Sequence, residues 1–168
     1  MKYKFSHYKS DAVATQEVPG RKGIAYWLDR EPVEWVDEDG GEHATPRNIV
    51  TDGFSVPKVV WGILKWLDSR IPGFVHDPAY WLQYCSKALA DYNIYAGVCS
   101  LAVGKKWHRR FLIRRAARII WAGLKVGGWL AWNRYKAQLE LLGYEGVLAL
   151  HTAETLDEAR VIAKQGMV

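Results

Sequence analysis

Four polar side chains between residues 76 and 91 have the types and spacing of a hydrolytic site. His76 and Asp77 are adjacent, Tyr80 follows His76 at i+4, and Asp91 lies 15 residues after His76. On a helix, His76 and Tyr80 share one face and Asp77 is rotated away. If a following helix packs antiparallel, Asp91 can accept a hydrogen bond from one imidazole nitrogen, which leaves the other nitrogen as a general base.

A glycine turn upstream adds oxygen donors to this set. Asp52 and Gly53 follow Thr51, and Gly53 allows the turn to expose its carbonyl groups at low steric cost. If Asp77 faces this turn, its carboxylate and the turn carbonyls form a hard-oxygen site, which suits Ca²⁺. The residues therefore predict a calcium site made by Asp77, Asp52 and Gly53, beside the base His76.

These residues resemble a motif of the secreted phospholipase A2 superfamily, most closely that of its prokaryotic and fungal branch. That branch has a D-G-C-S loop, an H-D-x-x-Y helix and a later Asp on the partner helix. The chain has the same order in Asp52-Gly53-Phe54-Ser55, His76-Asp77-x-x-Tyr80 and Asp91. Phe54 replaces the Cys of that branch, and no Cys precedes His76, so the disulfides of secreted members are absent.

The resemblance implies a phospholipid ester hydrolase with a role for each residue. His76 would activate a water as the general base, Asp91 would orient His76, and Tyr80 would support their hydrogen-bond network. Asp77 and the main-chain carbonyl groups near Asp52 would hold Ca²⁺, which polarises the ester carbonyl group and stabilises the oxyanion. The resemblance thus implies the catalytic residues His76, Asp91 and Tyr80, with Ca²⁺ as the cofactor.

A second resemblance covers more of the chain. The pattern T-D-x-x-S-x-P, then H-D, then A-D, and finally G-G-W-x-x-W is similar to that of an uncharacterised protein family of tailed phages and prophages. It is carried by Thr51, Asp52, Ser55, Pro57, His76, Asp77, Ala90, Asp91, Gly127, Gly128, Trp129 and Trp132. That family implies a phage origin and no established activity.

Two functions follow as expectations. The first is a phage-encoded phospholipase A2-like lipid ester hydrolase that acts in host membrane breach or lysis. The second is a non-catalytic virion or tail accessory protein that keeps the helical platform for assembly. The sequence also leaves simpler interpretations open: His76-Asp77 could mark only a helix N-terminus, and Thr51-Asp52-Gly53 could be only a turn. The order of His43, His76-Asp77 and Asp91 is also that of metal-dependent phosphohydrolases.

Size and composition bound these functions. The 168 residues fit one domain, and the hydrophobic content of 49% excludes a disordered chain. Cys85 and Cys99 make no disulfide framework, and we interpret them as small buried residues. The N-terminus lacks the apolar stretch of a signal peptide, and four basic residues interrupt the most apolar region, 111–132, which rules against a membrane-spanning helix. We therefore expect the host cytoplasm or a phage virion as the location.

The expected fold class is α+β, mainly α, with a small N-terminal antiparallel sheet and a helical domain that holds an antiparallel helix pair similar to that of phospholipase A2. Alternating apolar residues predict strands within residues 1–50, at 24–28, 33–36 and 47–50, the last two separated by an Asp-Gly turn. Helices are expected at 59–67, from His76 or Asp77 to Cys85, from Ser86 to 103, and at 106–125, 129–142 and 155–164.

The helix ends follow from local signals. Pro72-Gly73 is expected to break the helix at 59–67, and Pro78 suits a first helical turn, which places the next helix start near His76. Ser86 can cap the next helix, and Gly127-Gly128 is expected to kink or end the long helix. The site loop and helix pair thus occupy residues 51–104, and basic and aromatic helices occupy 105–168. Thr155 and Glu158 form a possible capping box for the last helix.

Lys105 to Arg118 combines seven basic residues with Trp107 and Phe111. With a net charge of +5, the chain suits an anionic partner. One interpretation is a surface that docks on the phospholipid membrane, and another is binding to the nucleic-acid backbone. Other virion proteins are a further partner class. An amphipathic core helix with a solvated basic face is the simplest alternative, and the apolar stripe Ile113, Ala117, Ile120 and Leu124 favours it for that face.

Overall fold

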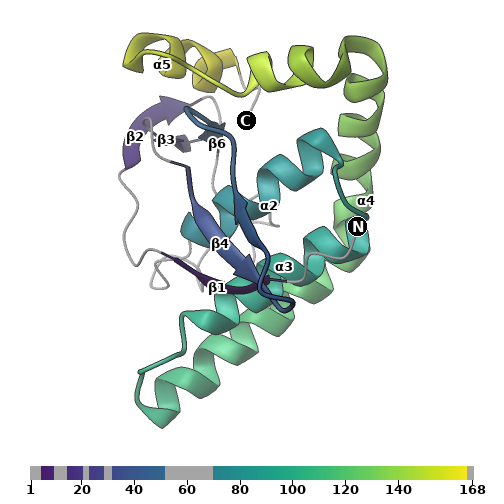
Figure 1. The fold of residues 1–168 in the computed structure, drawn as a ribbon. Helices are drawn as coiled ribbons and strands as arrows, with labels where there is room; N and C mark the ends of the chain where they lie inside the picture. Colours follow the sequence, from purple (N-terminus) through teal and green to yellow (C-terminus); the bar gives the residue numbers. More distant parts are fainter. Residues whose placement is uncertain (1–4, 10–14, 21–22, 29–31, 52–69, 166–168) are drawn as a thin grey trace.

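The computed structural model describes residues 5–9, 15–20, 23–28, 32–51 and 70–165. Within these residues, two small antiparallel sheets precede four helices, and the helices make up most of the molecule (Figure 1). The α+β, mainly α fold class is confirmed. None of the helices in the described ranges combines the length and the apolar character that crossing a membrane requires. The predicted helix at 59–67 lies outside the described residues.

The first sheet has the order β1-β4-β5, where β4 (Glu34–Asp37) lies between β1 (Phe5–Tyr8) and β5 (Glu42–Ala44). The predicted turn after β4 is present, because the Asp37 carboxylate accepts the N–H groups of Asp39 and Gly41 at 3.0 and 2.7 Å. This tight turn brings residues 42–44 back beside β4. The prediction of 47–50 as the returning strand is therefore wrong.

The second sheet has the order β2-β3-β6, formed by β2 (Thr15–Gly20), β3 (Gly23–Leu28) and β6 (Val50–Thr51). Val50 pairs with Trp27 of β3 rather than with the β4 hairpin. Strand β6 ends at Thr51, where the predicted site loop begins. The loop residues Asp52 and Gly53 themselves lie outside the described residues.

Helix α2 (Arg70–Leu82) begins six residues before the predicted start at His76. Pro72 does not mark a break between helices, because it lies in the first turn of α2, where no backbone N–H is needed. Pro78, expected near the helix start, lies inside the helix. Gln83 ends α2 in a left-handed conformation, with φ of 48°.

Helix α3 (Lys87–Ser100) begins as predicted, with the Ser86 side chain accepting the N–H group of Leu89 at 3.3 Å. Helix α4 (Trp107–Leu150) runs past Gly127-Gly128, so the predicted break there is wrong. The kink lies at Gly143, which has φ of 69°. Helix α5 (Leu156–Gln165) carries the predicted capping box, in which Thr155 and Glu158 exchange two bonds of 3.3 Å.

Three clusters of buried side chains hold these elements together. The central cluster joins α2, the first sheet and the middle of α4, with Phe74 and Trp35 among its members. A second cluster joins α3 to the first half of α4, and these two helices project as a hairpin beyond the sheets (Figure 1). The third cluster packs α5 on the second sheet. The predicted site residues that the structure describes, His76, Asp77, Tyr80 and Asp91, lie on α2 and α3, within or beside the central cluster.

Candidate functional site

His76, Tyr80 and Asp91 converge where α2 packs against α3. The imidazole of His76 and the ring of Tyr80 lie one helical turn apart, with centroids 4.2 Å from each other. The Tyr80 hydroxyl donates a hydrogen bond of 2.5 Å to Asp91 Oδ1. The same carboxylate oxygen lies 3.9 Å from His76 Nε2. The helix pair therefore brings Asp91 near the imidazole, but 3.9 Å is too long for a hydrogen bond, and the buried Nε2 atom has no hydrogen-bond partner among the described residues.

Asp77 approaches the imidazole from its other nitrogen. Asp77 Oδ1 lies 3.2 Å from His76 Nδ1, and Asp77 Oδ2 accepts a short hydrogen bond from the hydroxyl of Thr51. Thr51 ends β6 and directly precedes Asp52. Asp77 thus faces the start of the glycine loop, and the imidazole has one carboxyl group beside each ring nitrogen.

Lys87 joins this site, although the sequence analysis missed it. Its Nζ donates to Asp91 Oδ2 at 2.6 Å and to the carbonyl oxygen of Leu124 at 2.9 Å. The Lys87 side chain is only 5% exposed, and its Nζ lies 5.1 Å from the centroid of the Trp129 ring. The available signal was the i, i+4 spacing of Lys87 and Asp91 on one helix.

The G-G-W-x-x-W segment of α4 closes over the same residues. A Cβ atom at Gly128 would lie 2.6 Å from the Tyr80 hydroxyl and 3.0 Å from Lys87 Nζ, so only glycine fits there without a shift. The Trp132 ring meets the edge of Tyr80, with centroids 5.1 Å apart. The motif therefore serves a close helix crossing and not a kink.

Burial and charge together set the protonation of these groups. His76, Asp77 and Asp91 are each 2–3% exposed. Burial alone would lower the pKa of His76, but the hydrogen bond with Asp77 and the nearby Asp91 outweigh it and raise that pKa above its usual value. Burial would raise the pKa of Asp91, but His76, Lys87 and Tyr80 together hold it below its usual value.

Of the three predicted calcium donors, the structure describes only Asp77. Both oxygens of Asp77 already take part in contacts, with Thr51 and with His76. Within the described ranges, no group of three or more His, Cys, Asp or Glu side chains could hold a metal ion. The other predicted donors, Asp52 and Gly53, lie outside these ranges.

Three other residues considered in the sequence analysis are separate from this network. His43 Nε2 lies 2.7 Å from Asp37 Oδ2 and its ring stacks on Trp35, which places His43 on the β4–β5 hairpin. Cys85 and Cys99 are half-buried, and burial raises the pKa of the Cys85 thiol to about 11. This thiol is therefore a poor nucleophile near neutral pH.

A second buried histidine, His151, escaped the sequence analysis. It is 1% exposed, and its ring stacks on Trp81 of α2 with centroids 3.9 Å apart. Burial lowers the pKa of His151 to about 4, so its ring is neutral at pH 7. No local signal marks this position, because the stacking partner lies 70 residues earlier in the chain.

Comparison of the chain with protein-family models, with curated proteins and with solved structures gives no match.

Proposed function

We propose that this chain is a phospholipase A2-like hydrolase of phospholipid esters. The observation that carries the proposal is the imidazole of His76 placed between Asp91 and Asp77, one beside each ring nitrogen. The hydrogen bond from the Tyr80 hydroxyl to Asp91 agrees with the role that the sequence resemblance implies for Tyr80, and Asp77 contacts Thr51, the residue before Asp52. A phage origin, and a role at the host membrane, belong to the same proposal and rest on the sequence patterns.

We propose a role for each ring nitrogen. Lys87 and Tyr80 hold the Asp91 carboxylate ionised and fixed, and in the proposed mechanism an Nε2–H group of His76 faces this carboxylate across 3.9 Å. Nδ1 then carries the lone pair and acts as the base, on the side of Thr51 and the glycine loop. This assignment requires Asp77 to turn from Nδ1 during the reaction, because its carboxylate occupies that position.

The chemical step is a general-base hydrolysis. His76 Nδ1 takes a proton from a water molecule while the water oxygen attacks the carbonyl carbon of the ester. The acyl C–O bond then breaks, and the proton held by the imidazolium passes to the leaving alkoxide. The products are a fatty acid and a lysophospholipid. In the phospholipase A2 superfamily that the sequence resembles, Ca²⁺ stabilises the oxyanion, and we propose Asp77 as the described residue that would contribute to such a site.

A second candidate function is assembly without catalysis. His76 is 2% exposed, and Asp91 accepts hydrogen bonds from Lys87 and Tyr80. The network is therefore also consistent with buried polar groups that only pair with one another in the core. A buried polar network of this kind can fix the crossing of two helices without any reaction. A separate groove of about 730 Å³, with Tyr84 and Tyr144 in its lining, offers a surface for a virion partner.

Fatty-acid release from mixed phospholipid vesicles, with Ca²⁺ and with a chelator, separates the two functions. We expect the wild-type protein to release fatty acid, and His76→Gln and Asp91→Asn to lower the rate by at least about 100-fold, because the first removes the general base and the second removes the carboxylate that orients it. Asp157→Asn, an exposed Asp on α5, is the matched control and should keep the wild-type rate. Circular dichroism of each variant reports whether it is folded.

The outcomes assign the function. No release by the wild-type protein under either condition supports the assembly protein, and full activity of folded His76→Gln rejects His76 as the base. Release that is the same with Ca²⁺ and with the chelator removes the calcium role alone.

A further inference from the structure

One long segment of the chain carries charge of a single sign. Between Tyr92 and Leu139 the chain has ten Lys or Arg residues and no Asp or Glu. Seven of the ten lie within Lys105–Arg118, at the tip of the α3–α4 hairpin, which projects beyond the sheets (Figure 1). We call residues 103–119 the basic arm. Such a concentration attracts an anionic surface.

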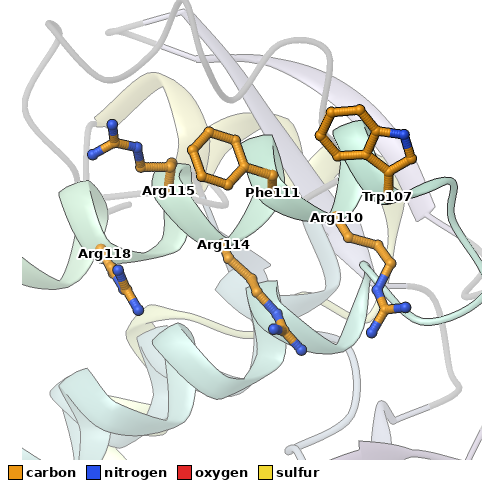
Figure 2. A pocket seen from close by; sticks show the side chains of 6 residues that line it. All are labelled: Trp107, Arg110, Phe111, Arg114, Arg115 and Arg118. Atoms are coloured by element: carbon orange, nitrogen blue, oxygen red, sulfur yellow. The ribbon is translucent and has the colours of Figure 1, made fainter.

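The arm arranges its charged and aromatic side chains in two rows. Arg110, Arg114 and Arg118 follow one another at i, i+4 and i+8 and point to one side of α4 (Figure 2). Trp107, Phe111 and Arg115 form the neighbouring row and point to the other side (Figure 2). Together the six side chains line a shallow hollow of about 470 Å³.

The opposite face of the arm is already used by the fold. Ile113, Ala116, Ala117 and Ile120 are buried against α3 in the second core cluster. The two rows therefore face outward, with Trp107 80% exposed and Phe111 55% exposed. Among the described residues, none of the four arginines in the hollow forms an ion pair. Their mutual repulsion is relieved when an anionic partner binds.

Exposed aliphatic side chains on the basic arm favour a phospholipid bilayer over nucleic acid as the anionic partner. Val103, Leu112 and Ile119 are 80%, 48% and 47% exposed. Nucleic-acid bases stack on aromatic rings and guanidinium planes, so aliphatic side chains add little to such a surface. At a bilayer, by contrast, aliphatic and aromatic side chains enter the boundary between headgroups and acyl chains while basic side chains meet the phosphates.

We propose that the basic arm docks the protein on anionic phospholipid bilayers. Arg110, Arg114 and Arg118 contact the headgroup phosphates, and Trp107 and Phe111 insert between the headgroups. This inference deepens the proposed lipid hydrolysis and rests on it for its biological purpose, whereas membrane binding is a property of the arm that can be measured apart from hydrolysis.

Vesicle flotation with ether-linked phospholipids tests the docking, because these lipids contain no acyl ester to hydrolyse. We expect the wild-type protein to float with vesicles that contain phosphatidylglycerol and not with pure phosphatidylcholine. Arg114→Gln/Arg118→Gln should weaken the binding by about tenfold or more, since each basic residue near an anionic surface contributes separately. Arg134→Gln/Lys136→Gln removes the same charge elsewhere on the exposed face of α4 and should bind like the wild type.

The aromatic row gives a second, independent readout. Salt screens the arginine contacts but not the insertion of apolar rings. Trp107→Ala/Phe111→Ala should therefore bind at low salt and detach at a salt concentration that the wild type withstands, while Leu141→Ala, a change at an 81% exposed apolar position, should not.

Three outcomes would overturn the proposal. They are equal binding of the two double-arginine variants, no flotation of the wild type with anionic vesicles, and retention of duplex or single-stranded DNA by a protein that ignores the vesicles. His76→Gln should float like the wild type, so a failure of docking and a failure of catalysis are distinguishable.

Discussion

At the scale of single residues, Lys87 determines whether the buried carboxylate of Asp91 is tolerated. Its ammonium group is the fixed cation at this carboxylate, at 2.6 Å, and the carbonyl group of Leu124 also depends on it. Removing one partner from a buried ion pair leaves an uncompensated charge, which is far costlier than losing a surface pair. Lys87 therefore supports the proposed site by stabilising it.

Replacement of Lys87 by Met keeps the length of the apolar stem and removes the charge. We expect Lys87→Met to lower the free energy of unfolding by about 3 kcal/mol or more, measured by urea denaturation. Lys136→Met is the matched control, because Lys136 forms an exposed i, i+4 pair with Glu140 at 3.8 Å. That change should cost under about 0.5 kcal/mol. Equal effects of the two changes would show that Asp91 does not depend on Lys87.

Local spacing explains which site residues could be predicted. The i, i+4 spacing of His76 and Tyr80 and the cap at Ser86 are short-range signals. They were sufficient to predict that Asp91 lies near the imidazole. The contacts of Lys87 with Leu124 and of His151 with Trp81 join distant segments. They depend on how α4 crosses the other helices, which no local pattern encodes.

At the scale of elements, Gly127 and Gly128 have different roles although they are neighbours. A Cβ atom at Gly127 would meet no heavy atom within 4 Å. A Cβ atom at Gly128 would meet Tyr80, which cannot move aside because it is 2% exposed and packed against His76 and Trp132. Gly127 is therefore a control position, in the same helix, for substitutions at Gly128, where α4 closely approaches α2.

We expect Gly128→Ala to destabilise the protein by about 1–3 kcal/mol, because the added methyl group forces the helices apart. Gly127→Ala should instead stabilise it by about 0.5–1 kcal/mol, since alanine is the better helix former. Thermal and denaturant unfolding of both variants measure the difference. A similar effect from both, in either direction, would contradict the crowded crossing.

The same glycines show why element ends were harder to predict than element types. A Gly-Gly pair is a local breaker, and the prediction of a kink at Gly127-Gly128 followed from that rule alone. In α4 the packing of Gly128 overrides the rule, and the kink lies at Gly143, where φ is 69°. Pro72 was treated as a breaker for the same reason, although its position in the first turn of α2 needs no N–H group.

At the scale of the whole molecule, α4 ties the parts together. Its first half packs on α3, its middle covers the candidate site, and its end reaches the second sheet, where Val50 donates to the carbonyl oxygen of His151 at 2.7 Å. His151 thus stands at the junction of α4, α2 and β6. A change in its charge acts on the packing that joins the helices to the sheet.

The two buried histidines give the stability of the whole molecule opposite dependences on pH. The pKa of His76 is raised in the folded protein. The stabilisation that His76 adds to the free energy of unfolding is therefore fully present below about 6.5, the usual pKa, and is lost as pH rises through the folded pKa. The pKa of His151 is lowered to about 4, mainly by burial. The charge of Asp77 opposes this shift, and the charge of Arg134 adds to it. Its contribution is complete above about 6.5 and is lost as pH falls to about 4.

We therefore expect the free energy of unfolding to fall by about 3 kcal/mol between pH 6.5 and pH 4, because the shift of His151 from 6.5 to about 4 is worth about 1.4 kcal/mol per pH unit. The pKa of Asp91 lies below its usual 3.8, so the stability that depends on its ionised carboxylate is lost mainly below pH 4. His151→Phe retains a ring to stack on Trp81 and should flatten the curve by that amount in urea denaturation at each pH. If wild type and His151→Phe lose the same stability across the window, the acid sensitivity belongs to other groups and His151 does not govern the junction.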